Sequence, residues 1–191
     1  MIPASRRELI RKGVHTAGLL FIPLLYYSEK IVLGIIGFFF IVYPIIEWGL
    51  IKGWHIPLIS ALTKYSKRPD EQKLGFAWPA YFLAIGVMFS LIFFDRRIAA
   101  LAIFHVCLGD TVAAVSGRCW GKTRLFFNRR KTWVGSLAYL LVTFVGGLYW
   151  LPPAQALLLA TVGAAVESLP FKNLDNLLIP VVVSLMGSRL L

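Results

Sequence analysis

Residues 98–116 read IAALAIFHVCLGDTVAAVS, and this stretch decides the fold class. It is long and apolar enough to cross a bilayer as a helix, which takes about 20 residues. A carboxylate, Asp110, nevertheless lies within it, roughly 10 Å from the end of the span at the rise of an α-helix. Burying a charge in hydrocarbon is costly, so an acid at this depth indicates a functional site. Close helix packing, with Asp110 paired to a basic residue, is the alternative.

The rest of the chain has the same apolar character. It is 58% hydrophobic, and its charged residues cluster between long uncharged runs. Three further segments are clear candidates for spanning helices, 31–51, 75–94 and 134–151, and three are marginal, 13–27, 153–169 and 174–190. The sequence therefore predicts an all-α, polytopic membrane bundle of about seven transmembrane helices, with six or eight as alternatives. We find no sign of a second domain, so residues 1–191 are expected to form a single one.

The basic residues sort by side when the amino terminus is placed in the cytoplasm. Lys and Arg are retained on the cytoplasmic face during insertion. Of the 20 in the chain, only four fall outside, at Lys30, Arg96, Arg97 and Arg189. The others lie at the amino terminus and in inner connectors, chiefly 52–73 and 117–132. This pattern predicts a cytoplasmic amino terminus, a site on the cytoplasmic face and contact with an anionic bilayer. Although the net charge is +11, this distribution of basic residues argues against a nucleic-acid partner.

The connector that follows Asp110 combines small, cationic and hydroxyl residues. Ala113, Ala114 and Gly117 lie three, four and seven residues after Asp110, on the same helical face. Glycine lets backbone amides approach phosphate oxygens, and Lys and Arg neutralise them. The connector is therefore a candidate polyphosphate site, through Gly117, Arg118, Gly121, Lys122, Thr123, Arg124, Arg129, Arg130, Lys131 and Thr132. An anchor for anionic headgroups is the alternative. The run from Gly121 to Thr123 is not a P-loop, because it follows a membrane helix and the first glycine is missing.

A second polar face is expected at the amino terminus. Glu8, Arg11, Lys12 and His15 are spaced so that they share one side of the entering helix. A solvated cap with a snorkelling Arg and Lys would explain three of them. His15 lies too deep for an anchor, and its imidazole is suited to hydrogen-bond an acid or a phosphate.

A third group lies near the carboxyl terminus. Glu167 ends one expected span, and Asp175 with Asn176 opens the next, with Pro170 and Pro180 interrupting the helices. Broken helices at membrane depth usually line a site. Carboxylate and amide oxygens suit Mg²⁺ that also holds phosphate and water. A helix cap is the alternative for Asp175.

Taken in order, these segments resemble the family of CTP-dependent lipid kinases that includes dolichol kinase, phytol kinase and the CTP-dependent diacylglycerol kinase. The resemblance covers nearly the whole chain, from the Glu8–His15 face through 109–122 and the stretch KTWVGS at 131–136 to Glu167, Asp175-Asn176 and Ile179-Pro180. Members of that family usually have glutamate where this chain has Val134. Either Glu167 supplies the missing acid, or the family pattern tolerates the change.

The resemblance implies transfer of the γ-phosphoryl group of CTP to the hydroxyl of a lipid alcohol, such as a polyprenol, a phytol-like alcohol or diacylglycerol. It implies Mg²⁺ or another divalent cation as cofactor. Asp110, Glu167 and Asp175 would bind the metal, or in one case accept the hydroxyl proton. The nucleotide would be held by Arg11, Lys12, His15, Gly117, Arg118, Gly121, Lys122, Lys131, Thr132, Ser136 and Asn176. Two rival functions are a CTP:lipid-phosphate cytidylyltransferase, which releases pyrophosphate and a CDP-lipid, and an anion transporter or channel.

Overall fold

The structure is a computed structural model that describes residues 11–54, 78–171 and 174–190. Within these ranges the chain is helical, apart from loops and one isolated β-bridge between Arg124 and Thr132. Residues 11–16 are helical, and the elements that follow are η1 (Ala17–Leu20), α2 (Phe21–Tyr27), α3 (Glu29–Ile51), α6 (Trp78–Phe93), α7 (Arg96–Phe104), η2 (His105–Gly109), α8 (Asp110–Cys119), α9 (Trp133–Gly147), α10 (Pro153–Ser168) and α11 (Asp175–Gly187). Each expected segment is helical over most of its described length, which confirms the all-α class.

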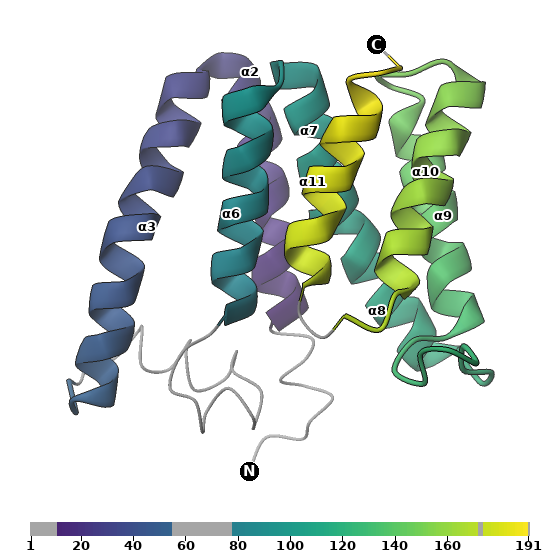
Figure 1. The fold of residues 1–191 in the computed structure, drawn as a ribbon, viewed down its shortest axis with the longest axis horizontal. Helices are drawn as coiled ribbons and strands as arrows, with labels where there is room; N and C mark the ends of the chain where they lie inside the picture. Colours follow the sequence, from purple (N-terminus) through teal and green to yellow (C-terminus); the bar gives the residue numbers. More distant parts are fainter. Residues whose placement is uncertain (1–10, 55–77, 172–173, 191) are drawn as a thin grey trace.

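The helices run side by side along one direction (Figure 1). Two of them, Glu29–Ile51 and Arg96–Cys119, are long and apolar enough to cross a membrane. The apolar helices α6, α9 and α11 are shorter, with 16, 15 and 13 residues. Seven spans and a cytoplasmic amino terminus therefore stay predictions. We expected Pro180 to interrupt its helix. It does not, because α11 continues through it.

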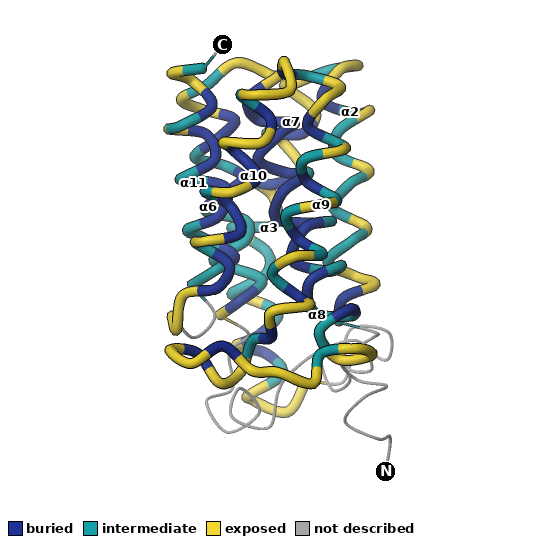
Figure 2. Tube along the Cα trace, turned by 90° about the vertical axis from the view of Figure 1, so that its right-hand side faces the viewer, coloured by how far each residue is buried: buried dark blue, intermediate teal, exposed yellow. Residues whose placement is uncertain are grey.

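The continuous helix from α7 to α8 is the centre of the bundle. Residues 99–103 are fully buried, and α7 packs against α2, α6 and α11 (Figure 2). It begins at Asp95, whose Oδ1 accepts hydrogen bonds from the amides of Arg97 and Ile98 at 2.7 and 3.2 Å and so caps the first turn. This central position places Asp110, the first residue of α8, among the surrounding helices.

A π-helical turn, η2, comes directly before Asp110. Such turns insert one extra residue into a helix and are frequent at functional sites. Gly109 ends this turn, and a Cβ there would lie 2.6 Å from the ring of Tyr139 and 2.8 Å from the methyl group of Thr143 on α9. The missing side chain therefore lets α9 pack against the helix beside Asp110.

The small residues after Asp110 also serve helix packing. A Cβ on Gly135 would lie 2.7 Å from the carbonyl oxygen of Ala113, and one on Gly117 would lie 2.7 Å from Thr132 Oγ1. We expected this strip to let a bulky or charged group approach. Part of it is instead covered by the first turn of α9, which carries Thr132 and Gly135 against α8.

Candidate active site

A cavity of about 420 Å³ opens at the end of the bundle where α8 ends and α11 begins. This volume is within the range of small-molecule sites. Eleven of the predicted site residues line it: Arg11, Lys12, Asp110, Gly117, Arg118, Gly121, Lys131, Thr132, Glu167, Asp175 and Asn176. The sequence segments that carry them are far apart, so the fold gathers them into one place.

Three predicted residues are not among those that line the cavity: His15, Lys122 and Ser136. Lys122 is exposed on the connector, while His15 and Ser136 lie behind acids that do line it. Glu8 lies outside the described residues. The role that we predicted for Lys122 in holding phosphate therefore has no support from its position.

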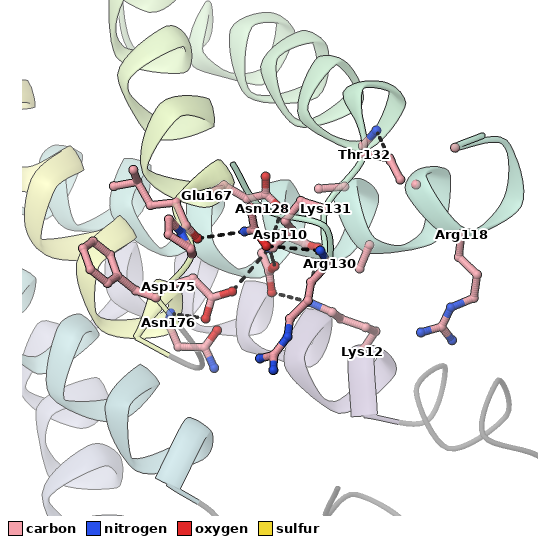
Figure 3. Close-up of a pocket in the computed structure, with 18 of the residues that line it drawn as sticks. Lys12, Asp110, Arg118, Asn128, Arg130, Lys131, Thr132, Glu167, Asp175 and Asn176 are labelled. Carbon is pink, nitrogen blue, oxygen red and sulfur yellow. Dashed lines mark hydrogen bonds and ion pairs between the residues drawn. The ribbon is translucent and has the colours of Figure 1, made fainter. Parts of the chain in front are cut away.

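The ammonium group of Lys131 lies among three carboxylates (Figure 3). Its Nζ is 2.5 Å from Glu167 Oε1, 3.4 Å from Asp175 Oδ2 and 3.8 Å from Asp110 Oδ1. The acids come from α10, α11 and α8, so one cation joins three helices. Charge-assisted contacts of this kind are stronger than neutral hydrogen bonds.

The three acids determine the protonation state of Lys131. Burial lowers the pKa of the Lys131 ammonium, but the negative charges of Asp110, Glu167 and Asp175 outweigh burial and hold that pKa above its ordinary value. Lys131 therefore keeps its proton at neutral pH, and can act as a cation but not as a general base.

Asp110 has a second cationic partner in Lys12, which donates to Asp110 Oδ2 and, at 3.2 Å, to the Asp110 carbonyl oxygen. Both residues are buried, at 5% and 3% exposure. Lys12 is thus an internal ion-pair partner and not a solvated cap. The alternative that we considered for Asp110, pairing with a basic residue, does occur. However, both its cationic partners border the cavity, which packing alone does not require.

His15 contacts the Lys12–Asp110 pair but does not itself line the cavity. Its Nε2 donates to the carbonyl oxygen of Val106 at 2.9 Å and lies 3.6 Å from Asp110 Oδ2. Val106 is inside the π-helical turn. Because a carbonyl can only accept, this contact requires the proton on Nε2. His15 therefore joins the amino-terminal helix to the turn that orients Asp110.

Asn128 is a site residue that sequence reasoning missed. Its amide nitrogen donates to the carbonyl oxygens of Ser168 and Leu169, both at 3.0 Å, and its Oδ1 accepts from the amide of Arg130 at 3.2 Å. Asn128 is buried and lines the cavity. It therefore fastens the cationic connector to the end of α10, next to Glu167. The available signal was a lone amide among Phe and Arg residues.

The stretch that includes Val134 has mainly structural contacts. Thr132 Oγ1 accepts from the amide of Gly135 at 3.1 Å and caps α9. Ser136 Oγ lies 2.8 Å from Ser168 Oγ and 3.5 Å from Glu167 Oε2, which it supports. Val134 is 36% exposed and is not among the lining residues, whereas Glu167 is. This geometry fits the alternative in which Glu167 supplies the missing acid.

The cavity lining combines cations with the three acids. Figure 3 shows Arg118 apart from Glu167 and Asp175, whereas Lys12, Lys131 and Arg130 lie near Asp110 and Asp175. Arg124 and Arg130, two cations of the predicted polyphosphate connector, also belong to the lining. Arg124 is oriented by its Nη1, which donates to the Arg129 carbonyl oxygen at 3.0 Å. The cavity thus holds both cations suited to polyanions and a group of acids.

Carboxylate oxygens are the right donors for Mg²⁺. Among the residues that the structure describes, however, no three acids, histidines or cysteines are grouped closely enough to enclose a metal ion alone. Asp175 is the least enclosed of the acids, with a side chain 21% exposed. Any ion bound here would need ligands from another molecule, such as phosphate oxygens or water.

Comparison with known proteins finds several phytol kinases of plants. The chain is 28% identical over 201 residues to phytol kinase 1, chloroplastic, of Arabidopsis thaliana, covering 92% of this chain and 64% of that protein. It is 30% identical over 159 residues to probable phytol kinase 3, chloroplastic, of Glycine max, covering 74% and 50%. An uncharacterized protein of Methanocaldococcus jannaschii is 28% identical over 184 residues, covering 93% of this chain and 91% of that protein. No family model and no solved structure matches.

The chain spans between half and two thirds of the length of these plant relatives. The similarity to the first of them nevertheless extends over 92% of this chain.

Proposed function

The chain is a relative of the phytol kinases, and we propose that it is a kinase that transfers the γ-phosphoryl group of CTP to the hydroxyl of a membrane lipid alcohol. One observation supports this proposal most strongly. Asp110, Glu167 and Asp175 surround Lys131 in a cavity whose lining also includes Lys12 and four arginines. Phosphoryl transfer depends on positioning and on charge neutralisation, and both kinds of group are present.

The arginines of the cavity would hold the triphosphate. Arg11, Arg118, Arg124 and Arg130 line the cavity, and arginine forms paired hydrogen bonds with phosphate oxygens. Lys131 would contact the terminal phosphate, because its protonated ammonium lies beside the three acids, one of which would receive the hydroxyl proton. In this arrangement the γ-phosphate lies between the arginines and the carboxylates.

The acids of the cavity would hold Mg²⁺ together with the phosphates. Mg²⁺ usually takes one or two carboxylates and completes its octahedron with water and substrate oxygens. Asp175 and Glu167 are suited to this role, with Asp110 contributing from the opposite side of Lys131. When bound, the ion would neutralise charge on the β- and γ-phosphates.

The transfer itself needs few groups. The lipid hydroxyl oxygen forms a bond to the γ-phosphorus, and the bond between that phosphorus and the β–γ bridging oxygen breaks, so that CDP leaves. The hydroxyl proton passes to one of the three carboxylates. Lys131 and the arginines stabilise the negative charge on the transferred group and on CDP.

We further propose that the chain crosses the membrane several times, with the cavity at the cytoplasmic face. Large apolar side chains are exposed around the bundle, for example Phe38 on α3, Leu141 on α9 and Leu185 on α11. Exposed apolar surface of this extent suits a lipid environment. A lipid substrate would then reach the site from the bilayer without exposing its chain to water.

The direct test supplies the purified protein with γ-labelled CTP, Mg²⁺ and a panel of lipid alcohols. We expect a labelled lipid monophosphate and CDP. Pyrophosphate and a CDP-lipid would instead establish a cytidylyltransferase, and solute transport in liposomes without nucleotide consumption would establish a transporter.

Asp110→Asn should reduce turnover by at least a hundredfold while the protein still inserts, because it removes the charge that Lys12 and Lys131 share. Asp95→Asn is the matched control, since Asp95 lies outside the cavity and asparagine also caps helices. Wild-type activity in Asp110→Asn would contradict the role of Asp110.

A further inference from the structure

We propose that Leu169, Pro170 and Phe171, together with Pro79, form a subsite for the hydrocarbon chain next to the hydroxyl of the substrate. The inference rests on the proposed function and specifies where the lipid lies. These four are the side chains of the cavity lining that are apolar and larger than alanine. They come from the loop after α10 and from the first turn of α6.

The cavity is divided by chemistry. Its arginines come from the amino-terminal helix, from α8 and from the connector, while its large apolar residues come from α6 and from the loop between α10 and α11. Glu167 lies two residues before Leu169 and Asp175 four residues after Phe171. The acids that would receive the hydroxyl proton therefore adjoin the apolar residues.

The apolar side chains of the loop are exposed although they belong to a cavity. Leu169 is 39% exposed and Phe171 is 50% exposed. Leaving such groups in water is unfavourable, and an alkyl chain that covers them would gain about 25 cal/mol for each Å² removed from water. Phosphate groups would gain nothing from them.

The start of the loop is held in place, so its apolar groups form a defined surface. Leu169 has the extended conformation (φ −64°, ψ 150°) that a residue before proline prefers. Its carbonyl oxygen accepts a hydrogen bond from Asn128 at 3.0 Å. Pro79 is held as well: the side-chain Nδ2 of Asn176 donates to the Pro79 carbonyl oxygen at 2.9 Å and fixes α6 against α11. A preformed apolar surface of this kind binds with a smaller entropy cost.

The test compares Phe171→Ala with Phe38→Ala, a matched control because Phe38 is also an exposed phenylalanine and lies on α3, outside the cavity. Kinetics are measured in mixed micelles, with the lipid alcohol expressed as a mole fraction. We expect Phe171→Ala to raise the KM for the lipid alcohol by about tenfold, as for a lost aromatic contact, and to leave the KM for CTP unchanged. Phe38→Ala should resemble the wild type.

Three results would overturn the subsite. The first is an unchanged lipid KM in an active Phe171→Ala protein. The second is a rise in the KM for CTP alone, because Phe171 would then stack on the nucleobase. The third needs no variant: a lipid alcohol with a photoreactive diazirine in its chain should label the peptide that contains residues 169–171 in the wild-type protein, and labelling elsewhere only would contradict the proposal. If the wild-type protein phosphorylates no lipid alcohol at all, the proposed function fails instead, and the two failures are distinguishable.

Discussion

Lys131 is the residue on which the geometry of the cavity depends most. Three carboxylates face its ammonium group, at distances of 2.5, 3.4 and 3.8 Å. Without that charge, acids from three helices would repel one another in a partly buried space. A divalent cation between these acids would also have to displace the ammonium, so Lys131 and the metal compete for one position. Phosphate oxygens can resolve this competition by drawing Lys131 away.

Lys131→Met should therefore lower stability and raise the affinity for metal. We expect a loss of about 3 kcal/mol, the lower end of the range for removing one partner of a buried ion pair, because the Lys131 side chain is 23% exposed. Millimolar Mg²⁺ should restore part of the lost Tm in this variant and change the wild-type Tm much less, both without nucleotide. Lys131→Arg retains the charge and serves as the control. An equal Mg²⁺ effect on the Tm of the wild type and Lys131→Met would contradict the competition.

At the level of elements, the connector between α8 and α9 acts as one unit with the end of α10. Its turn is closed by backbone hydrogen bonds from Leu125 to Lys131 and from Lys131 to Asn128, at 3.1 and 3.0 Å. Leu125 is buried beneath it. The Asn128 side chain then fixes this turn to α10. The position of Lys131 among the acids thus depends on a contact that is not itself charged.

Asn128→Ala should loosen the connector. It leaves two carbonyl oxygens without their donor, which costs about 1–3 kcal/mol, and it should raise the KM for nucleotide by about tenfold. Limited trypsin digestion measures the loosening, because the connector contains Arg124, Arg129, Arg130 and Lys131 as cleavage sites. Cleavage there should accelerate in Asn128→Ala and stay slow in Thr123→Ala, an exposed hydroxyl residue of the same connector. Equal cleavage rates in the two variants would show that Asn128 does not hold the connector.

The close packing of α8 against α9 leads to a second prediction about the helices. In Gly135→Ala the new methyl group would lie 2.7 Å from the Ala113 carbonyl oxygen, so one helix must move. We expect a loss of stability of about 1–3 kcal/mol, as for other overpacked cores, and reduced turnover because Thr132 and Lys131 move with α9. Gly37→Ala is the control, since nothing lies within 4 Å of the added atom and alanine favours helix. Chemical denaturation in detergent compares the two; similar stabilities would contradict the packing argument.

For the whole molecule, hydropathy predicted the positions of the helices, and local signals predicted most residues of the cavity. An acid within a long apolar segment, such as Asp110, is visible in a sequence because it would be costly in lipid. The π-helical turn and the central place of Lys131 were not predictable, because they depend on contacts between distant segments. Lys131 and Asp175 are 44 positions apart, and Lys12 and Asp110 are 98 apart. The sequence could not show that Lys122 lies outside the cavity lining, because a cation in a glycine-containing turn looks the same whether or not it faces the cavity.

Orientation in the membrane is a property of the whole chain, and the two ends of the bundle provide its test. Cys119 is exposed at the end of α8 that borders the cavity, whereas Cys107 is buried. Tyr149 is 80% exposed and follows α9 at the opposite end (Figure 1). If the cavity faces the cytoplasm, a membrane-impermeant maleimide should label Cys119 in inside-out vesicles and not in right-side-out vesicles. Tyr149→Cys combined with Cys119→Ser should give the reverse pattern, since an odd number of spans separates the positions. Labelling of both positions from one side would rule out the proposed topology without affecting the chemistry of the cavity.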